Sequence, residues 1–302
     1  MSVFFGASGR RLAAGLVIAA IALLAAGQVG AAALPPAEAA RLLRGVYERS
    51  KPAEPGRARR IEIASSETSG SVEGSVWGVI PEAYPAVRGL LADPARWCGI
   101  LMLHINNKSC RTESRRDETS LTLRIASRYD QAADKASAVT FSLRTDESTS
   151  DYLAVNLGAA DGPLWTRDHR IVLEAIPLDG GRTFLRLGYS YGYGLPAEMA
   201  MDVYFATSGS GKVGFTETRA GSGGGEHIGG VRGLMERNAM RYFLAVDAYL
   251  GELAAPQAER QERRLRRWYD STELYPRQLH EIDRETYLRL KRRELAATEP
   301  AR

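Results

Sequence analysis

The feature that most constrains this chain is a series of five short segments in which apolar residues occupy every second position. Successive side chains of a strand point to opposite faces, so each segment predicts a strand with one apolar face and one more polar face. The alternating residues are Leu121, Leu123 and Ile125; Val139, Phe141 and Leu143; Leu153, Val155 and Leu157; Ile171, Leu173 and Ala175; and Leu185, Leu187, Tyr189, Tyr191 and Tyr193. Together they predict a sheet whose apolar face must be covered by another element.

A helix suited to cover that face follows the strands. Between Met235 and Leu253 apolar residues recur at spacings of three and four, which places them on one side of a helix. The residues on that side are Met235, Ala239, Tyr242, Val246, Tyr249 and Leu253. A sheet wrapped around a helix can enclose an apolar molecule, so we interpret the chain as a container for such a ligand.

Other elements complete the predicted order. The segment from Val72 to Ile80 has the composition of a first strand, and prolines at 81 and 94 each open a short helical stretch. A last strand is expected at 212–218, before a glycine-rich segment and the long helix. The charged tail after residue 256 predicts two more helices with narrow apolar stripes.

This order of elements resembles the START-like superfamily, also called the SRPBCC group, whose members have the helix-grip fold. The resemblance covers roughly residues 72–253 and is carried by the stretch from Tyr84 to Trp97, the segment Gly162–Arg170 and the helix Val231–Leu253. It implies an α+β fold: a curved antiparallel sheet around a long C-terminal helix, with a deep cavity that binds a lipid, sterol, polyketide or other apolar molecule. The charged helical tail departs from the pattern, and its role stays open.

The sequence therefore predicts four parts. Residues 1–33 are expected to form a signal peptide or membrane anchor, and 34–71 a helix and a linker. Residues 72–255 are expected to form the helix-grip ligand-binding domain, and 256–302 the charged helical tail.

The first residues predict export. Arg10 and Arg11 precede an uncharged, Ala- and Leu-rich stretch that ends in three alanines at 31–33, which is typical of a secretory signal peptide. We expect cleavage near Ala33 and a periplasmic or secreted protein. The alternative is an uncleaved helix that anchors the protein to the inner membrane, because the stretch is long enough to span a bilayer.

The net charge bears on the class of partner, and the cysteine content bears on disulfide formation. Without Arg10 and Arg11 the chain is almost neutral, which gives no case for a nucleic acid partner. The only cysteines are Cys98 and Cys110, and in an oxidising compartment we expect them to form a disulfide rather than two buried thiols.

The predicted ligand-binding residues come from the last strand and the long helix. Tyrosine joins an apolar ring to a hydroxyl that needs a partner when buried, which suits a cavity for an amphipathic molecule, although plain core packing explains any single tyrosine as well. Asn238 either hydrogen-bonds a strand or a tyrosine, or recognises the polar end of the ligand. The candidate residues are Leu185, Leu187, Tyr189, Tyr191, Tyr193, Met235, Asn238 and Tyr242.

No catalytic residue is assigned. Asp168 and His169 have the chemistry for acid–base catalysis, but neighbouring strand residues point in opposite directions, so a structural role at the strand start is the preferred interpretation. The four histidines are scattered and no metal-binding spacing occurs, so we expect neither a metal ion nor an organic cofactor.

The sequence thus predicts an exported, non-enzymatic protein that holds a hydrophobic or amphipathic small molecule between sheet and helix. Two alternatives remain: a cyclase- or hydrolase-type enzyme that uses Asp168, His169 or a tyrosine in the same cavity, and an envelope assembly scaffold that binds a protein partner through its tail. Transient contact of the tail helices with a membrane is also open, although packing onto the domain or a partner is favoured.

Overall fold

The computed structural model describes residues 34–50, 61–115, 118–207, 209–218 and 226–298. The chain divides into two units, residues 1–53 and 54–302. In the first unit the described part is one amphipathic helix, α2 (Pro36–Ser50), which buries Ala39, Leu43 and Val46. The expected signal peptide lies outside the described residues.

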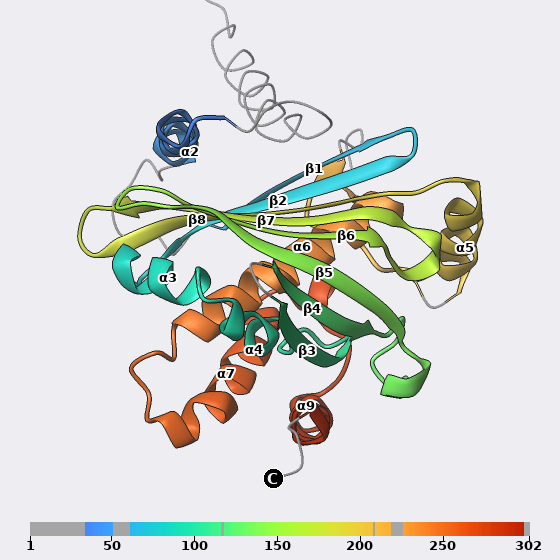
Figure 1. Cartoon of the computed structure of the whole chain (residues 1–302). Helices are drawn as coiled ribbons and strands as arrows, with labels where there is room; N and C mark the ends of the chain where they lie inside the picture. Colours follow the sequence, from blue (N-terminus) through green and yellow to red (C-terminus); the bar gives the residue numbers. More distant parts are fainter. Residues whose placement is uncertain (1–33, 51–60, 116–117, 208, 219–225, 299–302) are drawn as a thin grey trace, which may run out of the picture. The chain divides into compact units, whose positions relative to one another are not determined.

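The second unit is built on one antiparallel sheet of eight strands (Figure 1). Its strands are β1 (Glu62–Thr68), β2 (Ser71–Ile80), β3 (Asn107–Arg115), β4 (Glu118–Ile125), β5 (Ser137–Ser148), β6 (Leu153–Asp161), β7 (Arg167–Leu178) and β8 (Arg182–Gly192). Their spatial order is β1-β2-β8-β7-β6-β5-β4-β3, so β8 closes back onto β2 while the other neighbours are consecutive in sequence.

The helices and short segments connect and cover this sheet. Between β2 and β3 lie α3 (Tyr84–Leu91), η1 (Pro94–Arg96) and α4 (Trp97–Leu101), and the strands are further linked by η2 (Ala133–Lys135) and η3 (Pro163–Trp165). After β8 follow α5 (Leu195–Ala206), the short strands β9 (Glu217–Thr218) and β10 (Glu226–His227), and α6 (Gly230–Leu250). The chain ends in α7 (Gln257–Thr272), α8 (Pro276–Leu279) and α9 (Arg284–Thr298).

The alternating residues belong to the sheet, and the register places them in rows across its inner face. One row joins Val155, Leu173, Leu187 and Val76, and each of these side chains is at most 1% exposed. The next row joins Leu157, Ile171 and Tyr189. The sheet predicted from the alternation is confirmed, and so is the α+β helix-grip fold that the resemblance implies.

Helix α6 crosses the inner face of the sheet and packs against β1, β2 and β8 (Figure 1). The contact is close because β2 has a glycine at position 78: a Cβ there would come within 2.7 Å of the ring of Phe243. The helix is buried on its other sides as well, since α7, α8 and α4 also contact it. The sequence pattern had indicated a helix with only one covered side.

The tail packs onto α6 and β3 through both apolar and charged side chains. Trp268 and Tyr287 stack with their ring centroids 5.0 Å apart and are at most 2% exposed. Glu281 forms ion pairs with two buried arginines of α6, Arg237 at 2.5 Å and Arg241 at 2.9 Å. These contacts explain how a helix with several charged residues can lie inside the molecule.

Two further expectations have clear outcomes. Cys98 and Cys110 form a disulfide, with Cα atoms 5.3 Å apart, which ties α4 to β3 and stabilises by roughly 3 kcal/mol in the chain-entropy view. The expected last strand at 212–218 is wrong, because only Glu217–Thr218 is extended and it pairs with β10 outside the main sheet. The backbone N–H groups of Phe215 and Thr216 instead donate to the carboxylate of Glu236 on α6.

No helix within the described ranges is long and apolar enough to span a membrane.

Candidate functional site at the tyrosine-rich end of the sheet

The eight predicted ligand-binding residues lie in three settings along the interface between β8 and α6. Leu185 and Leu187 are fully buried in the aliphatic core. Tyr189 and Tyr242 meet edge to face, with ring centroids 5.8 Å apart. The remaining apolar members, Tyr191, Tyr193 and Met235, join a separate cluster, whose other members are Val72, Ala197 and Met201.

Two of the eight keep solvent contact although they lie between sheet and helix. Tyr189 and Asn238 are half-buried, whereas their neighbours Leu187 and Ala239 are at most 1% exposed. Asn238 makes a polar contact with His104, which stacks on Tyr242 with ring centroids 4.8 Å apart. This end of the interface therefore combines aromatic rings with polar groups, and we call Tyr189, Tyr242 and Asn238 with His169 the tyrosine site.

His169 lies next to a distortion at the start of β7. The pairing of β7 with β8 shifts register between Arg167 and Arg170, and Asp168 has φ 54°. Positive φ is uncommon for a residue with a side chain, and Asp168 in this conformation points to solvent. His169 faces inward, two positions before Ile171 in the alternation of β7. The expectation that the two neighbours do not share one site agrees with this geometry.

The preceding turn leaves just enough room for the imidazole. A Cβ on Gly162 would fall 1.9 Å from Nε2 of His169, so only glycine fits there. Leu164 and Trp165 in the same turn also have positive φ, of 56° and 58°. Together with Asp168 they mark a turn that the surrounding structure holds in a strained form.

A chain of hydrogen bonds runs from this turn to Tyr189. The hydroxyl of Thr166 lies 2.5 Å from the carbonyl oxygen of Pro163 and 2.8 Å from Nε2 of His169. Nδ1 of His169 lies 3.0 Å from the hydroxyl of Tyr189. The imidazole also stacks on Tyr191, with ring centroids 5.2 Å apart. Sequence reasoning had weighed His169 only with Asp168 and had not considered Thr166.

Burial moves the pKa of each of these side chains further from neutral pH. Loss of solvation lowers the pKa of His169 to about 4, against a smaller opposing effect of Asp168. Burial raises the pKa of Tyr189 well above its usual value, and it raises the pKa of Tyr242 to about 12. Near neutral pH the imidazole is therefore uncharged and both phenols keep their protons.

Helix α5 covers the outer end of the site. Its inner residues Ala197 and Met201 are buried in the cluster with Tyr191 and Tyr193. Its opposite face is apolar too, because Leu195, Met199 and Val203 are each at least 66% exposed. This helix had no periodic signal in the sequence, since apolar residues occur on both of its sides.

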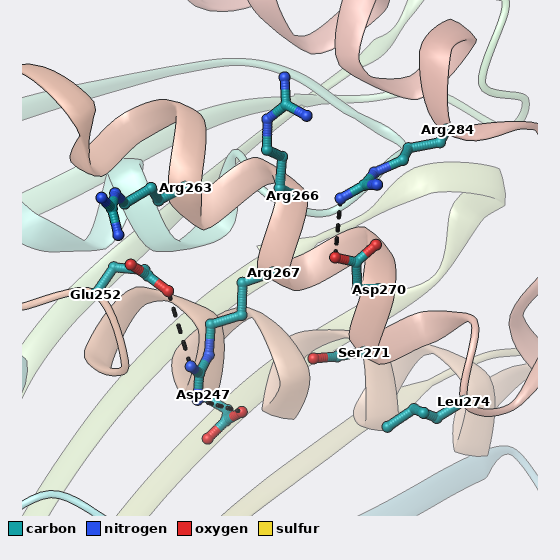
Figure 2. A pocket seen from close by; sticks show the side chains of 9 residues that line it. All are labelled: Asp247, Glu252, Arg263, Arg266, Arg267, Asp270, Ser271, Leu274 and Arg284. Atoms are coloured by element: carbon teal, nitrogen blue, oxygen red, sulfur yellow. Dashed lines mark hydrogen bonds and ion pairs between the residues drawn. The ribbon is translucent and has the colours of Figure 1, made fainter. Parts of the chain in front are cut away.

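A pocket lies elsewhere, beside the tail (Figure 2). It has a volume of about 550 Å³ and is formed by the end of α6, the following loop, α7 and the start of α9. Its arginines face carboxylates: Arg267 lies 3.7 Å from Asp247 and 3.8 Å from Glu252, and Arg284 lies 2.9 Å from Asp270. None of the predicted ligand-binding residues lines it. The residues that do are Asp247, Glu252, Arg263, Arg266, Arg267, Asp270, Ser271, Leu274 and Arg284.

Groups of three or more side chains able to hold a metal ion do not occur in the part of the chain that the structure describes. No ion or organic group is assigned to the tyrosine site either.

Comparison with known proteins gives similarity in structure only. No protein-family model matches the chain, and no curated protein matches it in sequence. Among solved structures, a conserved protein from Geobacillus kaustophilus is similar at 12% identity, covering 60% of this chain and 95% of that one, with a TM-score of 0.36.

Two enzymes with helix-grip folds are similar at the same level. Norcoclaurine synthase from Thalictrum flavum has 7% identity over 50% of this chain and 88% of its own, with a TM-score of 0.31. The Zhui aromatase/cyclase from Streptomyces sp. R1128 has 13% identity over 49% of this chain and 87% of its own, with a TM-score of 0.30. Similarity at this level carries no information on function.

Proposed function

We propose that this protein is an exported START-like (SRPBCC) binding protein that holds an amphipathic small molecule at the tyrosine site. The observation that supports this most is the hydrogen-bonded chain that ends at the hydroxyl of Tyr189, a half-buried residue between sheet and helix. Buried polar groups cost free energy compared with apolar packing, so a polar chain that interrupts the apolar inner face of β7 and β8 supports a use beyond stability.

Access to the site would require α5 to move. Within the described interior the side chains around Leu187 are closely packed, and the pocket shown in Figure 2 lies beside the tail. Helix α5 is anchored by only two fully buried side chains, Ala197 and Met201, and displacing it would uncover the apolar cluster that contains Tyr191 and Tyr193. The ligand would then take the place of α5 against Tyr191 and Tyr193 and would direct its polar end to Tyr189.

The enzyme alternative has one observation in its favour, since His169 and Tyr189 are in direct contact. Their pKa values argue against it, because burial moves the pKa of the imidazole to about 4 and raises that of the phenol well above its usual value. A general acid or base works best with a pKa near the working pH. The pair is therefore better suited to holding a polar group than to transferring a proton.

The scaffold alternative would be favoured by an interior without a cavity together with an exposed apolar stripe around Trp268. This side chain is 2% exposed and donates to the carbonyl oxygen of Arg241, which argues against such a stripe.

Native mass spectrometry of the full chain, purified from the periplasm or medium of an expressing bacterium, tests the proposal. We expect a co-purified molecule that organic solvent releases, together with the mass of a chain cut near Ala33. The variant Asn238→Leu should lose the bound molecule. The control variant Tyr84→Phe should keep it, because the hydroxyl of Tyr84 donates to the backbone of Thr149 between β5 and β6 and belongs to none of the predicted ligand-binding residues. Equal retention by both variants would show that the ligand lies elsewhere.

A further inference from the structure

The hydrogen-bonded chain fixes the direction in which every proton points, and this direction limits the chemistry of the ligand. The inference rests on the proposed binding function and concerns the polar end of the bound molecule. The chain of bonds begins at Pro163, whose carbonyl oxygen can only accept a hydrogen bond.

Thr166 has a single hydroxyl proton, and the 2.5 Å contact with the Pro163 carbonyl oxygen uses it. If the proton pointed elsewhere, two oxygen atoms would face each other at this distance without a proton between them. The hydroxyl of Thr166 is therefore an acceptor towards Nε2 of His169, 2.8 Å away. The proton of the neutral imidazole must then be on Nε2.

With Nε2 protonated, Nδ1 of His169 carries a lone pair and can only accept. Its partner at 3.0 Å is the hydroxyl of Tyr189, which must donate its single proton to Nδ1. Towards any further partner, the phenolic oxygen of Tyr189 can then only accept a hydrogen bond. The hydroxyl of the neighbouring Tyr242 has a different partner, the side chain of Asn107.

We propose that the tyrosine site selects molecules whose polar end is a hydrogen-bond donor, such as an alcohol, over matched molecules whose polar end can only accept, such as an ether or a ketone. Thr166 and His169 act as positioning residues, because they set the direction of the Tyr189 proton without touching the ligand. An acceptor-only ligand would place its oxygen against the oxygen of Tyr189 and would leave both without a proton.

The test uses three probes of similar size, each with about ten carbons: 1-decanol, methyl nonyl ether and 2-decanone. Dissociation constants for the full chain come from calorimetric titration and from the rise in unfolding temperature. We expect 1-decanol to bind about tenfold more tightly than either of the others, the effect of one neutral hydrogen bond. Equal binding of all three would overturn the inference while leaving the binding function intact, and no binding of any probe would overturn both.

Two threonine variants separate positioning from mere support of the fold. In Thr166→Val the acceptor for Nε2–H is gone, so the proton is expected to move to Nδ1 and donate to Tyr189, whose own proton becomes free for the ligand. The preference should then shift from 1-decanol to 2-decanone. Thr166→Ser keeps the hydroxyl and should retain the preference for 1-decanol. A valine variant that weakens all probes equally would contradict the positioning role.

The tautomer can be observed without any ligand. In ¹⁵N NMR spectra of the full chain at neutral pH, His169 should show a protonated Nε2 and an unprotonated Nδ1. The reverse tautomer in the wild-type protein would overturn the inference directly, whatever the probes do.

Discussion

The two ends of the interface between the sheet and α6 differ in composition although both come from the same alternating strands. At the closed end Leu187, Phe243 and Val246 are at most 1% exposed and belong to the large apolar core. At the other end Tyr189 and Asn238 stay half-buried among histidines and tyrosines. One hydrophobic pattern can therefore build a closed apolar core and a cluster of aromatic and polar side chains within the same element.

The largest effect is expected from a cavity at the closed end. Phe243→Ala should lower the free energy of unfolding by about 3–5 kcal/mol, because Phe243 is fully buried against Gly78 and neighbouring helix and strand atoms cannot move to fill the space. Urea unfolding followed by circular dichroism measures it. The matched change Tyr189→Ala at the other end should cost clearly less, since that side chain already contacts solvent. Equal losses would remove the distinction between the two ends.

The next effect is a dependence of the free energy of unfolding on pH, caused by His169 at the polar end of the interface. The pKa of His169 is about 4 in the folded protein and near 6.5 when unfolded, so the unfolded chain takes up the proton first as the pH falls. The contribution of His169 to stability is complete above about pH 6.5 and is lost between about pH 6.5 and 4, by about 3 kcal/mol.

The variant His169→Gln isolates this contribution. Glutamine does not titrate, so the loss of stability across that pH range should shrink by about the same amount, while the remaining slope from buried His104 persists. Unfolding curves at closely spaced pH values would show it. An unchanged slope would mean that His169 is not held neutral by burial.

A smaller effect tests how tightly the helix contacts the sheet. Gly78→Ala should destabilise by about 1–3 kcal/mol, because the added methyl group meets the Phe243 ring at 2.7 Å. Gly89→Ala in α3 is the matched control, since a methyl group there meets nothing within 4 Å and a helical alanine stabilises by up to about 1 kcal/mol. Thermal unfolding of both variants should give shifts of opposite sign, and shifts of the same sign would refute the close contact.

The smallest effect is expected for a single hydroxyl. Tyr189→Phe should cost about 1 kcal/mol, because Nδ1 of His169 loses its donor. It should also abolish any preference between 1-decanol and methyl nonyl ether. Tyr84→Phe removes a comparable hydroxyl bond and should cost a similar amount without affecting that preference.

The parts of the fold that could be predicted are those in which local pattern and tertiary role coincide. The inward residues of β4 to β8 alternate because one face of each strand is buried, and this periodicity is visible in the sequence. The disulfide was predictable because two cysteines offer one pairing. Tyr189 and Tyr242 were predicted to line the same space, and their rings are in contact.

The elements that escaped prediction lack such a pattern. Strand β1 is an edge strand whose residues are half-buried or exposed, so it has no apolar alternation. Helix α5 is apolar on both sides, and the segment at 212–218 is held away from the sheet by Glu236. In each case the deciding contact comes from residues distant in the sequence.

Only part of the candidate site could be predicted from the sequence, for the same reason. The tyrosines follow from the alternation, and so does the inward side of His169, which lies two positions before Ile171. The fit of its imidazole also depends on a bulge, a glycine at 162 and three residues with positive φ. A simple two-residue alternation does not show these features, so it could not place His169 against Thr166 and Tyr189.

The sequence by itself determined which strand faces are apolar, which helix covers them and which cysteines pair, because periodicity and chemical identity are local properties. The tertiary structure alone decided that the tail packs on α6 and that His169 meets Tyr189. These depend on hydrogen bonds and ion pairs between segments separated by many residues, whose partners are chosen only when the chain has folded.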